Sequence, residues 1–308
     1  MDIKREQSQE EFKRQEDAFR QRVDPQDSAE YAAESDRYHL YVSLACPWAH
    51  RTLIVRKLMG LEDVIGMTIV DPVRDQLGWR FGIGEGFSED PVNGFRLLEE
   101  AYIATNARWD GRVTVPVLWD KKTGKIVNNS EDDICLMFCK AFGKYTSQVL
   151  DLFPAQLADQ QDELSALIYD RINNGVYRAG FAGSQKVHEQ WVRTVFETLD
   201  VLDNRLSDRR YLLGDQPTEV DWRLFCTLVR FDAVYYVHFK CNVKRIVDYP
   251  NLSGYLRDLY QVTGISDTVN FDHIKRHYYM THPDINPTRF VPLGPEDLDL
   301  DAPHGRGA

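Results

Sequence analysis

Hydrophobic and polar positions change their spacing several times along the 308-residue chain, and each change marks an expected element. Residues 1–37 are rich in Gln, Glu, Asp and Arg, so we expect an N-terminal extension that is partly helical at most. The β-rich run from His39 to Ser43 predicts a strand. Pro47 to Met59 then carries its apolar side chains on one face, which predicts a helix with Gly60 at its C-terminal cap.

Further elements are predicted before residue 145. They are a strand at Ile65–Val70, a short helix near Phe95–Thr105, strands at Val113–Trp119 and Lys125–Val127, and a helix at Asp132–Phe142. The first two strands of the chain need a crossover helix and should be parallel, whereas the last two can form an antiparallel hairpin. We therefore predict an α/β domain over residues 38–145, with a mixed sheet covered by helices.

Helical spacing dominates from about Leu157. The candidate helices are Leu157–Asn173, Lys186–Arg205, Glu219–Val237 and Leu252–Gln261. Thr218 and Asp221 open the third of these with the spacing of a capping box, with Asp in place of the usual Glu. We predict an all-α domain over residues 146–280 and a tail over residues 281–308, rich in Pro, Asp and Gly, that lies on the surface.

Composition and charge exclude some classes of protein for this chain. The net charge of −11 argues against a nucleic-acid partner, and no stretch is long and apolar enough to span a membrane. The polar N-terminus lacks the apolar centre of a signal peptide, so we expect a cytoplasmic protein. Five cysteines in so long a chain do not indicate a disulfide framework.

Cys46 is the leading candidate for chemistry. It ends the predicted strand and is followed by Pro47, which suits the first position of a helix. Unpaired N–H groups and the helix dipole favour a thiolate there. Because Ala49 stands three residues on, any disulfide that Cys46 forms must be with another molecule. The alternative is a buried structural cysteine, a common fate for this residue.

Backbone and carboxylate groups offer a second set of candidates. Pro116 lies near the start of a predicted strand, where proline marks an edge, a first position or a special turn. At a strand mouth, the backbone of Val115 could pair with a peptide ligand. Ser130 could bind a ligand's carboxylate before the next helix, and Glu131 or Asp132 its amine, although capping alone would explain these residues.

Two residues in loop-like segments could also bind a ligand. Arg112 is suited to a carboxylate and the indole of Trp79 could cover a thiol ligand, but either could be an ordinary surface or packing residue. In the aromatic-rich C-terminal half most rings should be core, while a few phenols would suit a hydroxylated aromatic substrate.

No metal site is predicted. Cys135 and Cys139 share a helix face, but an apolar core stripe explains them better because no second pair supplies the remaining ligands. His273 and His277 lack the glutamate of a zincin motif between them.

Several segments, taken in order, resemble the Xi-class glutathione transferases, the S-glutathionyl-hydroquinone reductases. They are Cys46–Arg51, Gly78–Phe81, Gly111–Asp120, Asn173–Phe181, Asp221–Phe225, His238–Asn242 and Ile274–Tyr279, with His282-Pro and Ile285–Pro287 after them. The resemblance covers nearly the whole chain. It implies the glutathione transferase fold, an α/β thioredoxin-like N-terminal domain plus an all-α C-terminal domain, in a homodimer.

The resemblance also implies roles for the candidate residues. Cys46 would be the nucleophile, and the backbone of Val115, before a cis Pro116, would pair with the cysteinyl unit of glutathione. Trp79 and Arg112 would contact the tripeptide.

Tyr177 and Tyr278 match the substrate-side tyrosines of the family. The implied cosubstrate is glutathione and the implied substrate a quinone-derived thioether. Ser130 and Glu131 depart from the usual Glu-Ser order, which leaves open a shifted pose or another thiol such as mycothiol. The competing hypotheses are an omega-type thiol transferase or deglutathionylase and, in another class, a non-catalytic binding protein on the same scaffold.

Overall fold

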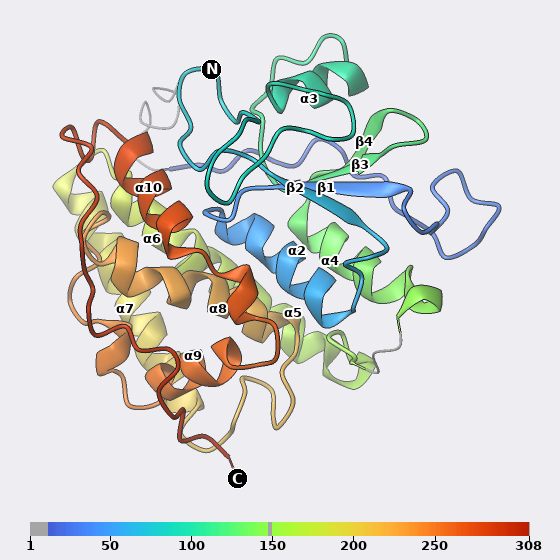
Figure 1. Ribbon diagram of the computed structural model, residues 1–308. Coiled ribbons are helices and arrows are strands. Elements are labelled where there is room, and N and C mark those ends of the chain that lie inside the picture. Colours follow the sequence, from blue (N-terminus) through green and yellow to red (C-terminus); the bar gives the residue numbers. More distant parts are fainter. Residues whose placement is uncertain (1–11, 147–149, 308) are drawn as a thin grey trace. The chain divides into compact units, whose positions relative to one another are not determined.

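The computed structural model describes residues 12–146 and 150–307 and divides into two compact units (Figure 1). Within the described residues, the first unit contains 15–146, 150 and 268–277, and the second contains 12–14, 151–267 and 278–307. The first eleven residues of the expected extension lie outside the described residues. The boundaries that we placed after residues 37, 145 and 280 stay a prediction.

The first unit is built on a four-stranded mixed sheet. Its strands are β1 (Tyr38–Val42), β2 (Gly66–Ile69), β3 (Val117–Asp120) and β4 (Lys125–Asn128), in the order β2-β1-β3-β4. β1 and β2 are parallel, and β3 pairs with both β1 and β4 in antiparallel fashion. The predicted mixed sheet, with its parallel pair and its hairpin, is therefore confirmed.

Three helices complete this unit: α2 (Pro47–Leu58), α3 (Glu99–Thr105) and α4 (Glu131–Lys140). α2 and α4 lie side by side on one face of the sheet, and α3 contacts β4 (Figure 1). All five residues of β1 are buried, because the strand lies inside the sheet with both faces covered.

The third strand is shorter than predicted. It begins at Val117, whereas the sequence suggested Val113. Pro116 has no N–H to donate to a ladder, which accounts for the later start. The peptide bond between Val115 and Pro116 is cis, as the resemblance implied.

Residues of the N-terminal extension run along β4. The N–H of Gln21 donates to the carbonyl of Val127 at 3.1 Å, and Arg20 forms a β-bridge with Asn128. One step on, Phe19 and Asn129 exchange hydrogen bonds, at 2.9 Å and 3.0 Å. The extension thus supplies backbone partners to the outer strand of the sheet.

The second unit is helical. Its helices are α5 (Ala158–Ile168), α6 (Gly175–Gly180), α7 (Gln185–Arg205), α8 (Glu219–Arg230), α9 (Leu252–Tyr260) and the last residues of α10 (Phe271–Thr281). The π-helical segments η3 (Tyr169–Asn173) and η4 (Phe231–Tyr235) follow α5 and α8. Short 3-10 turns occur in this unit at Ala155–Leu157 and Ile246–Asp248, in the first unit at Gly143–Tyr145, and where the units meet in sequence at Ser266–Thr268.

Two predicted helices, Leu157–Asn173 and Glu219–Val237, are thus α-helical only in part and end in π-helical turns. We did not predict α10, where buried histidines alternate with the apolar residues and blur the helical spacing. Among the helices of the described segments, none has the length and apolar character needed to cross a membrane.

Asp221 anchors the start of α8. Its carboxylate accepts hydrogen bonds from the N–H groups of Thr218 and Leu212, at 2.8 Å and 2.9 Å, and from the hydroxyl of Tyr255 at 2.8 Å. The predicted capping box is present. Asp221 is fully buried, and burial raises its pKa.

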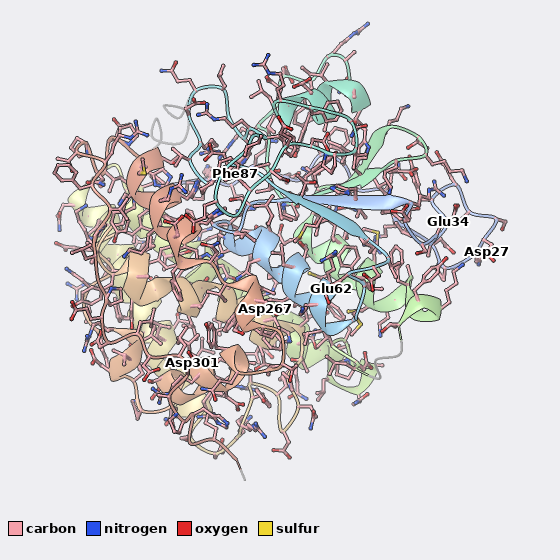
Figure 2. All side chains as sticks on the ribbon, in the orientation of Figure 1. Asp27, Glu34, Glu62, Phe87, Asp267 and Asp301 are labelled. Atoms are coloured by element: carbon pink, nitrogen blue, oxygen red, sulfur yellow. The ribbon has the colours of Figure 1, made fainter. Side chains whose placement is uncertain are left out.

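Acidic side chains such as Asp27, Glu62 and Asp301 are exposed to solvent (Figure 2). They contribute to the net charge of −11. Several ionisable groups are buried and paired with residues far along the chain, such as Arg37 with Asp120. One of them, His39 on β1, is 5% exposed and hydrogen-bonds Thr68 of β2 through Nε2 at 2.7 Å.

Stability should depend on the protonation of His39. Burial lowers its pKa from 6.5 to about 4. As the pH falls below 6.5, the unfolded chain takes up a proton at His39 that the folded chain does not. The free energy of unfolding therefore decreases progressively until the pH approaches 4. From pH 7 to pH 5 this loss should be about 2 kcal/mol.

Urea unfolding at pH 7 and pH 5 measures the effect. The control is His39→Gln, which is expected to lose about 2 kcal/mol less than the wild type between these pH values. Equal losses in the two proteins would show that His39 does not carry this pH dependence.

Candidate functional site

Cys46 caps the N-terminus of α2, as predicted. Its backbone is extended, with φ −75° and ψ 121°, and Pro47 opens the helix. The sulfur accepts a hydrogen bond from the N–H of Ala49 at 3.5 Å and lies 3.7 Å from the carbonyl oxygen of Val115, to which the S–H can donate. A sulfur that caps a helix N-terminus faces unpaired N–H groups and the positive end of the dipole, which favours the thiolate.

The other cysteines of the described chain lie in different surroundings. Cys135, Cys226 and Cys241 are buried, and burial raises the pKa of Cys241 to about 12. Cys139 is half-buried on α4. Cys46, at the N-terminus of a helix, is therefore the strongest candidate nucleophile.

The segment before β3 is held next to this thiol. The hydroxyl of Tyr102, on α3, donates to the carbonyl of Thr114 at 2.9 Å and accepts from the N–H of Thr114 at 3.1 Å. These bonds fix the backbone leading into Val115 and Pro116. The structure therefore brings the predicted strand mouth and Cys46 together.

Trp79 is held by packing. The indole is 5% exposed, stacks on the imidazole of His277 at 5.1 Å and 18°, and has the guanidinium of Arg74 5.4 Å from its ring centre. His277 is fixed in turn by a hydrogen bond of 2.7 Å between Nδ1 and the carbonyl of Pro72. These contacts fix the position of the indole ring.

Arg112 lies between α3 and β3, and its N–H donates to Oε1 of Gln15 in the extension at 3.0 Å. Burial lowers the pKa of its guanidinium. A partly desolvated arginine binds a carboxylate more strongly than one in water does.

Several charged side chains lie at the N-terminus of α4. Ser130 is the capping residue, and its N–H donates to Oδ1 of Asn128 at 2.7 Å. Glu131 is 3% exposed, and Arg51 of α2 lies 3.8 Å from it and 2.6 Å from Asp132. Two carboxylates facing one guanidinium leave a net negative charge, which suits a ligand ammonium group.

His273 and His277 make contacts with other groups of the first unit. The Nε2 of His273 is hydrogen-bonded to the carbonyl of Glu85 at 2.8 Å, and His277 stacks on Trp79. Within residues 12–146 and 150–307, no three His, Cys, Asp or Glu side chains are grouped as metal ligands.

Tyr177 and Tyr278 meet within the second unit. Their hydroxyls share a short hydrogen bond, and the hydroxyl of Tyr235 lies 3.0 Å from that of Tyr278. Phe12 of the extension packs on the ring of Tyr177 with a centroid distance of 5.7 Å. We call Tyr177, Tyr235 and Tyr278 the phenol cluster.

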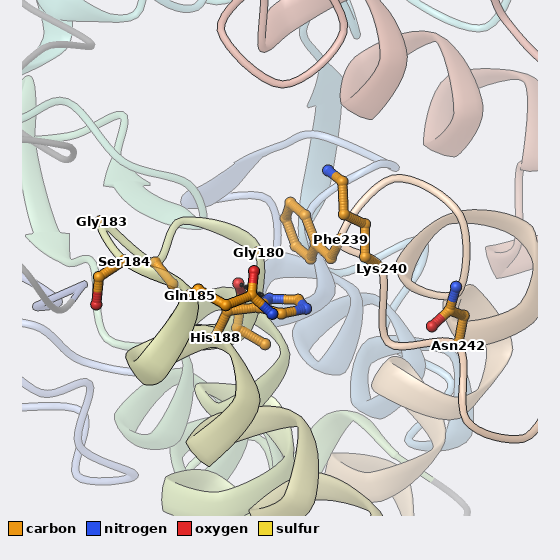
Figure 3. A pocket seen from close by; sticks show the side chains of 10 residues that line it. Gly180, Gly183, Ser184, Gln185, His188, Phe239, Lys240 and Asn242 are labelled. Atoms are coloured by element: carbon orange, nitrogen blue, oxygen red, sulfur yellow. Dashed lines mark hydrogen bonds between the residues drawn. The ribbon is translucent and has the colours of Figure 1, made fainter.

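The second unit also contains a cavity of about 570 Å³ (Figure 3). Phe239 lines the cavity and stacks on Tyr235 at 5.5 Å. A Cβ at Gly180 would lie 2.2 Å from the Phe239 ring, so only glycine allows this packing. The lining includes Ser184, His188 and Lys240 but no thiol or carboxylate, so the proposed nucleophile does not line it.

Sequence analysis did not identify several residues that contact the candidate site residues. Arg51 belongs to the motif that begins at Cys46, and its distance to Glu131 emerges only when α2 packs on α4. Tyr235 and Phe12 carry no local signal that distinguishes them from core aromatics. A plain helical period would not have predicted the π-helical turn that ends at Tyr235.

Comparison with known proteins adds independent findings. Family models for glutathione S-transferases match residues 45–141 with the N-terminal domain and residues 185–258 with the C-terminal domain. The chain is 51% identical to glutathionyl-hydroquinone reductase YqjG of Escherichia coli, over 92% of this chain and 86% of that protein.

Two solved structures are similar over most of their length. The glutathione transferase Xi from Phanerochaete chrysosporium has a TM-score of 0.90 and 48% identity, over 93% of this chain and 98% of that one. The glutathione-bound structure of YqjG has a TM-score of 0.91 and 50% identity, over 94% and 96% of the two chains.

Proposed function

The chain belongs to the Xi class of the glutathione transferases, and from that premise we propose that it is a thiol-dependent reductase that converts S-glutathionyl-hydroquinones to hydroquinones. The predicted fold class, an α/β thioredoxin-like domain plus an all-α domain, is that of the class. One observation carries the proposal: the Cys46 sulfur caps α2 and lies beside the backbone of Val115.

The reaction proceeds in two exchanges. The Cys46 thiolate attacks the sulfur of the thioether and forms a Cys46–glutathione disulfide. The electron pair of the broken carbon–sulfur bond goes to the ring carbon, which takes a proton and leaves as the hydroquinone. A second glutathione thiolate then attacks the mixed disulfide, which releases oxidised glutathione and returns the Cys46 thiolate.

Glutathione is bound by residues of the first unit. The backbone of Val115, ahead of Pro116, pairs with the cysteinyl unit, next to the Cys46 sulfur. Trp79 and Arg112 contact the tripeptide, the first through its rigid indole and the second through its positive charge. This arrangement presents the thioether sulfur to the nucleophile.

Ser130 and Glu131 receive the γ-glutamyl end. The first N–H groups of α4 favour the ligand carboxylate, and Glu131 pairs with the ammonium while Arg51 holds it in place. In the second unit, Tyr177 and Tyr278 bind the hydroquinone hydroxyls through their phenols.

Mass spectrometry after exposure to a glutathionyl-hydroquinone tests the function. We expect one glutathione adduct, on the peptide that contains Cys46, and its release as oxidised glutathione when fresh glutathione is added. Hydroquinone must form in the first step. If neither hydroquinone nor the adduct forms, the proposal is refuted. That result is the one expected of a non-catalytic binding protein.

An omega-type thiol transferase or deglutathionylase is the second candidate, because its chemistry needs only Cys46 and the thiol-binding residues. Comparing kcat/KM for a glutathionyl-hydroquinone and for a glutathionylated peptide separates the two. We further propose that the enzyme acts in the cytoplasm as a homodimer, on the resemblance of the chain to its class.

Glu131→Gln should raise the KM for glutathione about tenfold with little change in kcat, because it removes the carboxylate that pairs with the ammonium. A glutathione analogue that lacks the amino group should show no such loss. Equal losses for the two thiols would place the ammonium elsewhere.

The order Ser130-Glu131 also makes mycothiol the alternative cosubstrate. The two thiols can be compared by the rate at which each, at equal concentration, reduces the mixed disulfide at Cys46. We expect glutathione to be faster. A clear preference for mycothiol would reassign the cosubstrate and leave the role of Cys46 unchanged.

A further inference from the structure

Two buried histidines of α10, His273 and His277, bind the long connection that links β2 to α3. They are 0% and 9% exposed, and both belong to the first unit, as the connection does. Nε2 of His273 lies 2.8 Å from the carbonyl oxygen of Glu85. Nδ1 of His277 lies 2.7 Å from the carbonyl oxygen of Pro72. The pair therefore holds the β2–α3 connection at two points.

Both contacts have a fixed polarity and a close fit. A carbonyl oxygen only accepts hydrogen bonds, so each of these two ring nitrogens carries a proton and donates it. The connection also approaches His273 closely: a Cβ at Gly86 would lie 2.6 Å from Nε2 of that histidine. Gly86 has a φ of +77°, which favours glycine as well. The ring of Phe87 then meets the His273 imidazole edge-on at 6.2 Å.

Trp79 lies on the β2–α3 connection between these two points. The imidazole that bonds Pro72, that of His277, also stacks on the indole, with 5.1 Å between the ring centres and 18° between the planes. No described residue accepts a hydrogen bond from the indole N–H of Trp79. This atom is still reached by solvent, in contrast to the indole nitrogen of Trp119. The ring is thus held by its face, while its N–H can meet a ligand oxygen.

We propose that His273 and His277 are positioning residues that hold the β2–α3 connection, and with it the indole of Trp79, in the place where the indole contacts glutathione. The inference rests on the proposed function, because it deepens the glutathione contact assigned there to Trp79. It assigns neither histidine a contact with the ligand. Their loss should therefore weaken the binding of glutathione, while the chemistry at Cys46 proceeds at a similar rate once the thiol is saturating.

His277→Ala removes the bond to Pro72 and the stacking on Trp79 together. We expect the Kd for S-methylglutathione, which cannot form a disulfide, to rise about tenfold in a calorimetric titration. The KM for glutathione should rise by a similar factor with little change in kcat. His273→Ala removes one bond but leaves the stacked ring in place, so its Kd should rise about threefold. Because His277 acts through Trp79, His277→Ala should cause little further loss in a Trp79→Ala background.

His188→Ala serves as the control. Nδ1 of His188 lies 2.9 Å from the carbonyl oxygen of Ala179 in the second unit, so this variant removes the same kind of bond away from the β2–α3 connection. It should bind S-methylglutathione as the wild type does. If His277→Ala does not fold, His277→Phe replaces it: the ring on the indole is kept, the bond to Pro72 is lost, and the Kd should rise about threefold.

The outcomes separate the two proposals. A wild-type protein that binds S-methylglutathione but forms no hydroquinone overturns the proposed function, while a weaker Kd in His277→Ala still supports the positioning role. An active wild type, with the wild-type Kd in a folded His277 variant, overturns only the positioning role. A full tenfold loss in the Trp79→Ala background, or a loss that appears in kcat and not in KM, also overturns it. A wild type that neither binds nor reacts overturns both.

Discussion

Replacing Cys46 with alanine should lower turnover of a glutathionyl-hydroquinone by at least about a thousandfold. In the proposed mechanism both exchanges pass through this sulfur, and Ala49 offers no second thiol in the same helical turn. Alanine keeps the backbone and removes only the sulfur with its long hydrogen bonds to Ala49 and Val115, so the fold should persist. Steady-state assays and a circular dichroism spectrum measure the two effects.

Cys139→Ala is the matched control. Cys139 is half-buried as well, but it lies near the C-terminal end of α4, where the helix dipole disfavours a thiolate. This variant should keep near wild-type activity and still form the glutathione adduct. Substantial reduction by Cys46→Ala, or an adduct on Cys139, would contradict the assigned mechanism.

Asp221→Ala should destabilise the protein by about 3–5 kcal/mol, the largest effect on stability that we expect. The substitution leaves two backbone N–H groups and the Tyr255 hydroxyl without their acceptor in a fully buried site. It also removes the capping box of α8. The free energy of unfolding in urea measures the change.

Two further variants test this explanation. Asp221→Asn keeps one oxygen as an acceptor and should lose less stability than alanine does. Asp208→Ala removes an exposed carboxylate that pairs with its neighbour Arg209, and should leave the free energy of unfolding nearly unchanged. If Asp221→Ala were no worse than Asp208→Ala, the carboxylate could not be the anchor of α8.

Local signals explain what could be predicted from the sequence. The cap at Cys46 followed from a strand, one cysteine and a proline in succession, and the capping box from the spacing of Thr218 and Asp221. Neighbouring residues alone determine such features. The parallel pair and the hairpin followed from connection lengths, which limit how strands can pair.

The remaining features depend on contacts between distant segments. The pairing of Arg51 with Glu131 needs α2 to pack on α4, and the phenol cluster needs residues from three separate helical segments. Helix α10 was missed because its histidines are buried by partners far away in the sequence, such as Pro72 for His277. Hydrophobic spacing contains no information about such partners.

The N-terminal extension also affects how the protein behaves among its own copies. An outer strand with unpaired N–H and C=O groups is a template on which another chain can add a strand and begin to aggregate. Gln21 and Arg20 occupy that position along β4 and bond its backbone from within the same chain. The segment that precedes β1 therefore hinders edge-to-edge association of copies of the chain at β4.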